Sequence, residues 1–166
     1  AVDEGKAPVM LACDVKNAFS RTSREAQMFE LHQIGERSRI WEYSRSTYTN
    51  TFTVIKDCKR YSNMMLESRG SKQGGIKSPQ DYKSYNGALF RMIRMSGLGL
   101  KVGGEDYGCI MVADDALSLC SNIDEMREIS RIYSIFAKSY SVEYCLKKTI
   151  LNRFSDQKDN PEKAEM

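Results

Sequence analysis

The segment from Ile123 to Tyr140 carries the strongest folding signal in this chain. Apolar side chains recur there at spacings of three and four residues, the pattern of an amphipathic helix: Ile123, Met126, Ile129, Ile132, Tyr133, Phe136 and Tyr140. Ser121 or Asn122 can cap the N-terminus of this helix. A helix with one apolar face needs a second layer to cover that face, so the segment predicts a layered domain.

Short apolar segments separated by turn residues supply that second layer. We expect strands at Pro8–Cys13, Thr51–Lys56, Asn63–Glu67, Leu100–Val102, Tyr107–Ala113, Ala116–Leu119, Val142–Leu146 and Thr149–Phe154. Three further helices are predicted at Ser23–Ile34, where Thr22 and Glu25 form a capping box, at Ser38–Tyr48 and at Gln80–Met95. The order predicts an α+β fold, an antiparallel sheet with helices packed on one face. We expect residues 1–154 to form this core and residues 155–166, which are polar and charged, to form a tail or linker.

Composition excludes several other classes of protein. The longest apolar run, Ala7–Cys13, is far shorter than the roughly 20 residues that span a bilayer. The 5 cysteines are scattered and include no CxxC pair, which argues against a zinc site or a disulfide framework. We therefore expect an intracellular protein with reduced thiols and no membrane contact.

Charge is distributed unevenly along the chain. The segment from Val15 to Glu105 holds 16 Lys and Arg against 8 Asp and Glu, although the whole chain has a net charge of only +3. Aromatic residues are interleaved with these cations: Trp41, Tyr43, Tyr48, Phe52 and Tyr61. Such a segment is compatible with nucleic-acid binding, and equally with solvated surface charges and core aromatics.

Acidic residues stand at the ends of two predicted strands. Asp14 follows the apolar run ending at Cys13, and Asp114 and Asp115 lie at the tip of a predicted hairpin. A carboxylate at the edge of an apolar strand and two adjacent like charges are both costly unless a cation is bound. Mg²⁺ suits this ligand set because it binds one or two carboxylates together with substrate phosphates. The alternative is an Asp-Asp turn that faces water.

A glycine-rich loop runs from Arg69 to Pro79. Its glycines allow positive φ and a close approach of the backbone to a ligand. Its amides, with Lys72, Gln73 and Lys77, can line a phosphate-rich groove. The loop lacks the spacing of a Walker P-loop, and a plain connecting loop is an equally good interpretation.

In order and spacing these segments resemble the palm of reverse transcriptases, closest to the non-LTR (LINE-like) retrotransposon type. The matching segments are Asp14–Ser20 (motif A), Arg69–Pro79 (motif B), Ala113–Asp115 (motif C) and Lys148–Thr149 (motif D). The resemblance spans Val9–Phe154. It is carried mainly by motif B and by the order of the set, since the other motifs are weak when taken alone.

The resemblance implies roles for the acidic residues. Asp14 and Asp114 are expected to bind two Mg²⁺ ions, or Mn²⁺ in their place, with the Val15 carbonyl as a further ligand and Asp115 in support. One metal would activate a primer 3′-hydroxyl, and the other would hold the triphosphate and the leaving pyrophosphate. Lys148 is expected near the triphosphate, where it could donate a proton to pyrophosphate, although a surface lysine is an equally good interpretation.

Other residues acquire nucleotide and nucleic-acid contacts by the same resemblance. Phe19 stands at the steric-gate position that excludes a ribose 2′-hydroxyl, and Gln73 and Gly74 would contact the incoming nucleotide and the template. Three cations of motif B are expected to contact nucleic acid: Arg69, Lys72 and Lys77.

The implied function is RNA-templated DNA polymerisation, with deoxynucleoside triphosphates, an RNA template, a DNA primer and the rest of a retroelement polyprotein as partners. Fingers and thumb segments are not recognisable, so we expect this chain to be inactive by itself. Val112 replaces a common aromatic residue of motif C, and Cys145 replaces a common Asn near motif D. A non-catalytic domain that binds nucleic acid or a partner is the main alternative. An RNA-templated RNA polymerase is disfavoured by Ala113 and Phe19.

Overall fold

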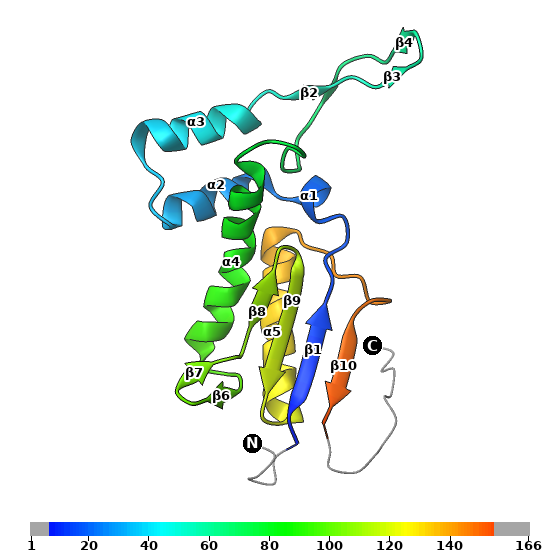
Figure 1. The fold of residues 1–166 in the computed structure, drawn as a ribbon. Helices are drawn as coiled ribbons and strands as arrows, with labels where there is room; N and C mark the ends of the chain where they lie inside the picture. Colours follow the sequence, from blue (N-terminus) through cyan, green and yellow to red (C-terminus); the bar gives the residue numbers. More distant parts are fainter. Residues whose placement is uncertain (1–6, 155–166) are drawn as a thin grey trace. The chain divides into compact units, whose positions relative to one another are not determined.

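The computed structural model describes residues 7–154, so the predicted tail at 155–166 lies outside the described part. The chain divides into two compact units. The first comprises Ala1–Ala18 and Asn86–Met166, and the second comprises Phe19–Tyr85. Figure 1 labels their elements, and each unit is described by itself.

A four-stranded antiparallel sheet forms the first unit, with strand order β10-β1-β9-β8. Its strands are β1 (Val9–Cys13), β8 (Ile110–Val112), β9 (Asp115–Cys120) and β10 (Ile150–Arg153). β1 pairs with β9 from Val9↔Cys120 to Cys13↔Ala116, and with β10 from Val9↔Arg153 to Ala12↔Ile150. β1 is therefore a central strand with partners on both sides (Figure 1).

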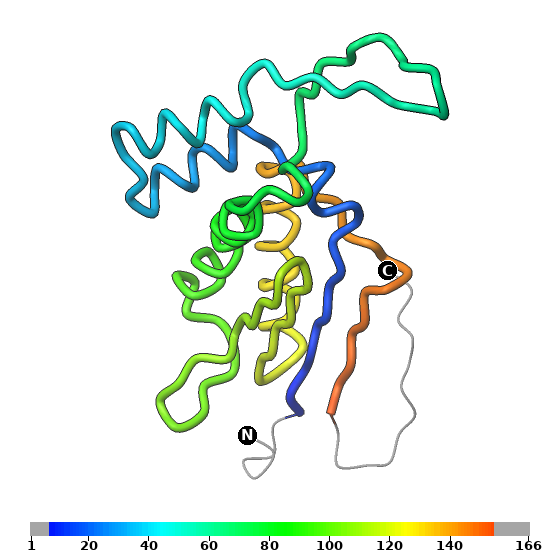
Figure 2. Tube along the Cα trace, turned by 45° about the horizontal axis from the view of Figure 1, so that its top comes forward, coloured from blue at the N-terminus to red at the C-terminus, as the bar shows by residue number. Residues whose placement is uncertain are grey.

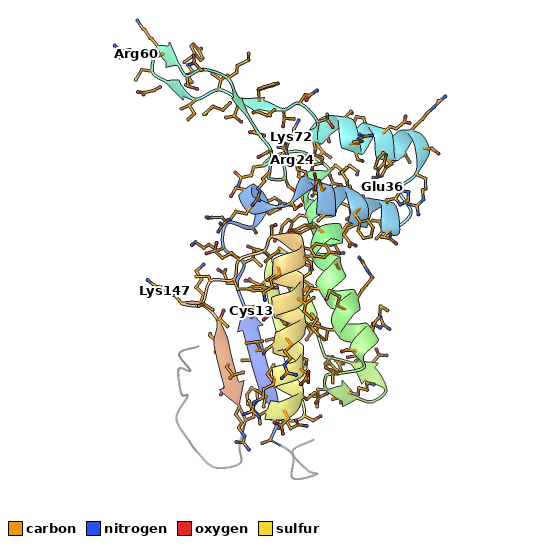
Figure 3. All side chains as sticks on the ribbon, turned by 180° about the vertical axis from the view of Figure 1, so that it is seen from behind. Cys13, Arg24, Glu36, Arg60, Lys72 and Lys147 are labelled. Carbon is orange, nitrogen blue, oxygen red and sulfur yellow. The ribbon has the colours of Figure 1, made fainter. Side chains whose placement is uncertain are left out.

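Helices pack against one face of this sheet, as the sequence predicts. Helix α5 (Ile123–Tyr140) lies behind the sheet in Figure 1 and in front of it in Figure 3, which is turned by 180°. Alternate β1 residues meet α5 and the second half of α4 (Ser78–Ser96) in one apolar cluster. The cluster includes Val9, Leu11, Cys13, Ala88, Leu89, Ile93, Ala116, Cys120, Met126, Ile129, Tyr133 and Phe136. The period of two on the strands and of three to four on α5 is what this packing requires.

A polar residue on the buried face of β9 is satisfied within the core. Ser118 is fully buried, and its hydroxyl lies 3.0 Å from the hydroxyl of Tyr133 on α5. Burial also raises the pKa of the Cys13 thiol to about 11 and that of Cys109 to about 11, so both remain protonated at neutral pH. Cys58, in contrast, is exposed.

The second unit contains α2 (Arg24–Gln33), α3 (Ser38–Tyr48) and a ribbon of short strands. The ribbon is made of β2 (Phe52–Thr53) paired with β5 (Met65–Leu66), and of β3 (Lys56–Asp57) paired with β4 (Arg60–Tyr61). In Figure 2 it runs out from the end of α3 as an extended hairpin. α3 has the predicted bounds, and the short helix α1 (Ala18–Arg21) was not predicted.

Several predicted boundaries were wrong for local reasons. Ser23, and not Thr22, caps α2, because the Ser23 hydroxyl accepts the Ala26 N–H at 3.3 Å. Thr22 is buried, and its carbonyl accepts a hydrogen bond from Gly70. The predicted strands at Thr51–Lys56 and Asn63–Glu67 are longer than the observed pairs, since the Ile55 N–H bonds to the hydroxyl of Ser62 instead of a ladder carbonyl.

The predicted strand at Val142–Leu146 does not form. This segment contacts the sheet through one isolated bridge, Val15↔Tyr144. The Cys145 carbonyl accepts hydrogen bonds from Lys148 and Thr149 in a turn, so it is already used locally and the ladder stops. β10 begins only at Ile150.

A backbone crossing beside the sheet leads to a stability prediction. β6 (Lys101–Val102) and β7 (Glu105–Asp106) form a hairpin between Gly99 and Gly108. Gly99 has a φ of +116°, and a Cβ there would lie 2.1 Å from the Gly108 Cα. We expect Gly99→Ala to lower the free energy of unfolding by about 3 kcal/mol, from left-handed strain plus overpacking, as measured by urea denaturation.

Gly104→Ala is the matched control for this prediction. Gly104 also has positive φ, +88°, but a Cβ there meets nothing within 4 Å. It should lose only the conformational part, about 1 kcal/mol. Equal losses in the two variants would contradict the close crossing at Gly99.

Candidate functional site

The acidic residues gather at one end of the four-stranded sheet. The last β1–β9 pair is Cys13↔Ala116, and the last β8–β9 pair is Val112↔Asp115. Continuing the antiparallel register by one residue places Asp14 across from Asp115, with Asp114 in the adjoining turn. Asp14 and Asp114 are half-buried, and Asp115 is exposed. The sheet thus brings to one end the carboxylates that the sequence places 100 residues apart.

A tight turn presents Asp114. The loop between β8 and β9 has two residues, Ala113 and Asp114, and Ala113 has a φ of +56°. Positive φ at the first loop position alone is typical of a type II′ hairpin turn, which normally favours glycine. The Asn86 side-chain amide donates to the Ala113 carbonyl at 3.1 Å and holds this turn from α4. Sequence reasoning missed Asn86, which is nearly fully buried.

The chain beyond Asp14 is held from the β10 side. The Cys145 N–H donates to the Asp14 carbonyl at 2.9 Å, and the Lys16 N–H donates to the Glu143 carbonyl at 2.8 Å. Backbone groups alternate sides along an antiparallel strand. Val15 lies between Asp14 and Lys16, so its carbonyl is directed to the opposite side, toward β9, which begins at Asp115.

Lys148 contacts the acidic end directly. Its Nζ lies 3.2 Å from Asp14 Oδ2 and donates a hydrogen bond to Oδ1 at 3.3 Å. The hydrogen bond and the negative charge of Asp14 raise the pKa of Lys148 above its usual value. Lys148 is therefore a fully charged ammonium at neutral pH, next to the carboxylate that the resemblance assigns to a metal.

A metal at this end would use few protein ligands. Within residues 7–154, the structure contains no group of three or more His, Cys, Asp and Glu side chains positioned to hold a metal ion. Mg²⁺ does not need such a cage, because it commonly binds one or two carboxylates and completes its shell with water and substrate phosphates. The oxygen ligands of Asp14 and Asp114 fit that mode of binding.

The remaining predicted residues lie in the second unit, in the loop that precedes α4 and in α1. Gly70 and Gly74 have φ values of +93° and +80°, a conformation that glycine allows. A Cβ on Gly70 would lie 3.1 Å from the Ser20 carbonyl oxygen, so only glycine fits there without a shift. The Ser71 N–H donates to the Phe19 carbonyl at 2.8 Å. The start of the loop is therefore packed closely against α1.

Phe19 and the loop side chains differ in accessibility. The Phe19 ring stacks on Tyr82 with centroids 4.6 Å apart and is half-buried. Arg69, Lys72 and Gln73 are exposed and line an open cavity of about 720 Å³. These three side chains are accessible to a ligand of the loop.

Lys77 is held by neighbouring carboxylates. Its Nζ lies 2.7 Å from Glu36 and 2.8 Å from Asp81. Burial disfavours the charged lysine, but the hydrogen bonds and charges of Asp81 and Glu36 outweigh it and raise the pKa of Lys77. A phosphate would have to compete with both carboxylates for this cation.

Arg24 on α2 is a residue that sequence reasoning missed. It is 8% exposed, and its guanidinium donates to the carbonyls of Gly70, Tyr48 and Glu67 at 3.0, 3.0 and 2.5 Å. It also donates to the Thr51 hydroxyl at 2.5 Å and pairs with the Glu67 carboxylate at 2.9 Å. Arg24 therefore connects the start of the loop to the residues that flank β2 and β5, Thr51 and Glu67. Its position in the capping region of α2 gave no sign of this role.

Comparison with solved structures identifies the fold. An apo telomerase from Candida tropicalis lacking its C-terminal domain matches with a TM-score of 0.70 and 16% sequence identity, covering 93% of this chain and 32% of that chain. Telomerase from Candida albicans, solved with a fragment of telomeric RNA, matches with a TM-score of 0.69 and 17% identity, covering 91% of this chain and 29% of that one. Telomerase is a reverse transcriptase. The chain has a reverse-transcriptase-like fold.

The fold agrees with the family that the motifs indicated, but the level of identity shows the fold alone. The chain spans about a third of the first of these structures. No protein-family model and no curated protein matches the sequence. None of the helices in residues 7–154 is both long enough and apolar enough to cross a membrane.

The Lys148–Asp14 contact predicts a titration effect. Because Asp14 raises the pKa of Lys148, the pair stabilises the fold below about pH 10.4, and this contribution is lost as pH rises through the folded pKa. We expect Asp14→Asn to bring the Lys148 pKa back toward its usual value, as measured by NMR titration of the lysine side chain. Asp124→Asn, which removes an exposed carboxylate paired with Arg127 on α5, should leave that pKa near the wild-type value. An unchanged pKa in Asp14→Asn would contradict the contact.

The Arg24 contacts predict a local loss of order. Replacing Arg24 with Met leaves several buried acceptors without a hydrogen-bond donor, and each such acceptor lowers the stability of the fold by about 1–3 kcal/mol. We expect Arg24→Met to lower the free energy of unfolding by about 3 kcal/mol and to speed hydrogen exchange of the Ser71 amide. Arg127→Met removes an exposed ion pair with Asp124, which is worth about 1 kcal/mol or less. Equal effects of the two substitutions would contradict the role assigned to Arg24.

Proposed function

We propose that this chain is the catalytic palm of a reverse transcriptase, which adds deoxynucleotides to a primer 3′-hydroxyl on an RNA template. The observation that carries the proposal is the register of the sheet. Adjacent antiparallel strands bring Asp14, Asp114 and Asp115 to one end, in a fold shared with telomerase. Carboxylates on neighbouring strands are what a two-metal phosphoryl-transfer site requires.

Asp14 and Asp114 would hold Mg²⁺, or Mn²⁺, with the Val15 carbonyl as a further ligand and Asp115 in support. Bound divalent metal would supply the charge that activates the 3′-hydroxyl and neutralises the triphosphate. The protein provides the positioning. The hydrogen bond from Asn86 to Ala113 holds the turn that carries Asp114, and the hydrogen bond from Cys145 holds the Asp14 backbone.

Lys148 would act on the triphosphate. In the structure its ammonium neutralises part of the Asp14 charge. A divalent cation at Asp14 competes with this ammonium because both bind the same carboxylate. Displaced from Asp14, the charged Lys148 would be free to bind the phosphates and to donate a proton to pyrophosphate.

The second unit would supply nucleotide and strand contacts. Phe19 would act as the steric gate that selects deoxynucleotides, and Gln73 and Gly74 would contact the incoming nucleotide and template. Arg69 and Lys72 are exposed cations that suit a phosphate backbone. Lys77 would contribute only by exchanging Glu36 or Asp81 for a phosphate.

The retroelement class is a finer proposal. Motifs A to D support the non-LTR type, in which the rest of a retroelement polyprotein would surround this palm. The telomerase of Candida albicans was solved with telomeric RNA, which supports a nucleic-acid partner for this fold. A non-catalytic nucleic-acid-binding domain is the second candidate, because the Lys148–Asp14 ion pair already occupies one predicted metal ligand.

Manganese binding tests the proposal. Mn²⁺ added to the isotope-labelled chain with a deoxynucleoside triphosphate should broaden the amide signals of Asp14, Val15 and Asp114 first. Asp114→Asn should weaken Mn²⁺ binding at least tenfold, because it removes a charged ligand from a site with few ligands. Broadening that is absent, or that is centred elsewhere, would argue for the non-catalytic alternative.

Asp124→Asn is the control for this experiment. Asp124 is an exposed carboxylate on α5, paired with Arg127, and its loss should leave Mn²⁺ binding unchanged. In RNA-templated primer extension by the full-length protein, Asp114→Asn should abolish synthesis, whereas Asp124→Asn should not. Extension that survives Asp114→Asn would refute the assignment.

A further inference from the structure

The cavity beside the glycine-rich loop is lined by residues of motifs A and B and by three hairpin residues that lie outside every motif. Its volume is about 720 Å³, and it lies entirely within the second unit. One wall is the loop itself, and the other is the base of the β2–β5 hairpin. The lining residues are Ser20, Thr51, Phe52, Glu67, Arg69, Gly70, Ser71, Lys72 and Gln73.

Charge in this cavity favours an anion. Arg69 and Lys72 are exposed at its loop wall, while Glu67 is the single acid in the lining. Glu67 is already neutralised: its carboxylate pairs with Arg24 at 2.9 Å and accepts a hydrogen bond from the Thr53 hydroxyl. The lining therefore presents two uncompensated cations together with hydroxyl and amide groups.

Phe52 adds an aromatic side chain to the lining of this cavity. It is 55% exposed, although its strand pairs with β5 at Leu66. A flat ring beside cationic side chains is the combination that single-stranded nucleic acid uses, because bases stack on the ring and phosphates bind the cations. Polar lining makes an apolar protein segment a poorer occupant.

The walls of the cavity are preformed. Arg24 bonds to Thr51, Glu67 and Gly70, and Gln27 donates to the Ser71 hydroxyl at 2.7 Å. Four lining residues are thus held by two buried side chains of α2, Arg24 and Gln27. Figure 3 labels Arg24 and Lys72. A site that is held in place before binding loses less entropy when its ligand arrives.

We propose that this cavity binds one nucleotide unit of a single-stranded nucleic acid, with its base stacked on Phe52 and its phosphates at Arg69 and Lys72. This site rests on the proposed function in one respect only, that the bound strand is a template. It adds to that function a hairpin residue, Phe52, outside every motif. Phe52 would then be a strand-binding residue and Arg24 a positioning residue.

Oligonucleotide binding tests this site. Fluorescence anisotropy would use an unstructured 12-nucleotide RNA and a DNA of the same sequence, with EDTA present so that the acidic end plays no part. We expect Phe52→Leu to raise Kd about 5- to 140-fold, because one stacked base contributes about 1–3 kcal/mol. Phe52→Trp keeps an aromatic surface and should bind within threefold of wild type.

Matched controls separate stacking from general effects. Tyr61 is a 67% exposed ring on the same hairpin, outside the cavity, and Tyr61→Leu should change Kd less than twofold. Arg69→Gln should lower the slope of log Kd against log salt by about 0.7. No binding of either oligonucleotide by wild type, or equal losses in Phe52→Leu and Tyr61→Leu, would overturn the proposal.

The two proposals can fail separately. Loss of binding in Phe52→Leu together with absent Mn²⁺ binding would uphold the strand site and refute the catalytic function. Normal Mn²⁺ binding with unchanged oligonucleotide affinity in Phe52→Leu would refute only the strand site. A loss that is larger for RNA than for DNA would support an RNA template at the site, and equal losses would support stacking that ignores the sugar.

Discussion

The pairing of β1 with strands on both sides is the constraint on which the first unit depends. β1 has only five residues, yet it hydrogen-bonds to β9 and to β10 and turns alternate side chains into the apolar cluster under α5. A slip of one residue would exchange its buried and partly exposed faces. The same register places Asp14, the residue after Cys13, across from Asp115 at the start of β9. The register of β1 therefore determines both the packing of the core and the position of Asp14.

A second constraint acts in the Phe19–Tyr85 unit, where the buried Arg24 joins several segments through hydrogen bonds. Its guanidinium satisfies carbonyls and a carboxylate from segments that have little regular structure of their own. Five donors in a fixed planar fork suit this task, and lysine could not replace them. The glycine-rich loop thus has a defined start at Gly70, while its exposed cations remain accessible.

The candidate site residues fall into two groups, one in each unit. Register and hydrogen bonds place Asp14, Val15, Asp114 and Lys148 at one end of the sheet. The cavity lining places Arg69, Lys72 and Gln73 beside Phe52. Lys77 belongs with neither group, because Glu36 and Asp81 hold it within its own unit. Motif B by itself does not distinguish Lys72 from Lys77. The structure does, because Lys77 pairs with two carboxylates and Lys72 is exposed in the cavity lining.

The sequence by itself determined the features that depend on local periodicity and backbone preference. α5 followed from its apolar spacing, α3 had the predicted bounds, and the glycines of the loop allowed the positive φ that Gly70 and Gly74 adopt. Tertiary structure decided what depends on distant partners. Only the folded chain showed that Arg24 joins the loop to the hairpin, that Asn86 holds the Ala113 turn, and that Val142–Leu146 makes a single bridge and no strand. Each of these outcomes depends on hydrogen bonds between residues far apart in the chain, which no local pattern of residue types encodes.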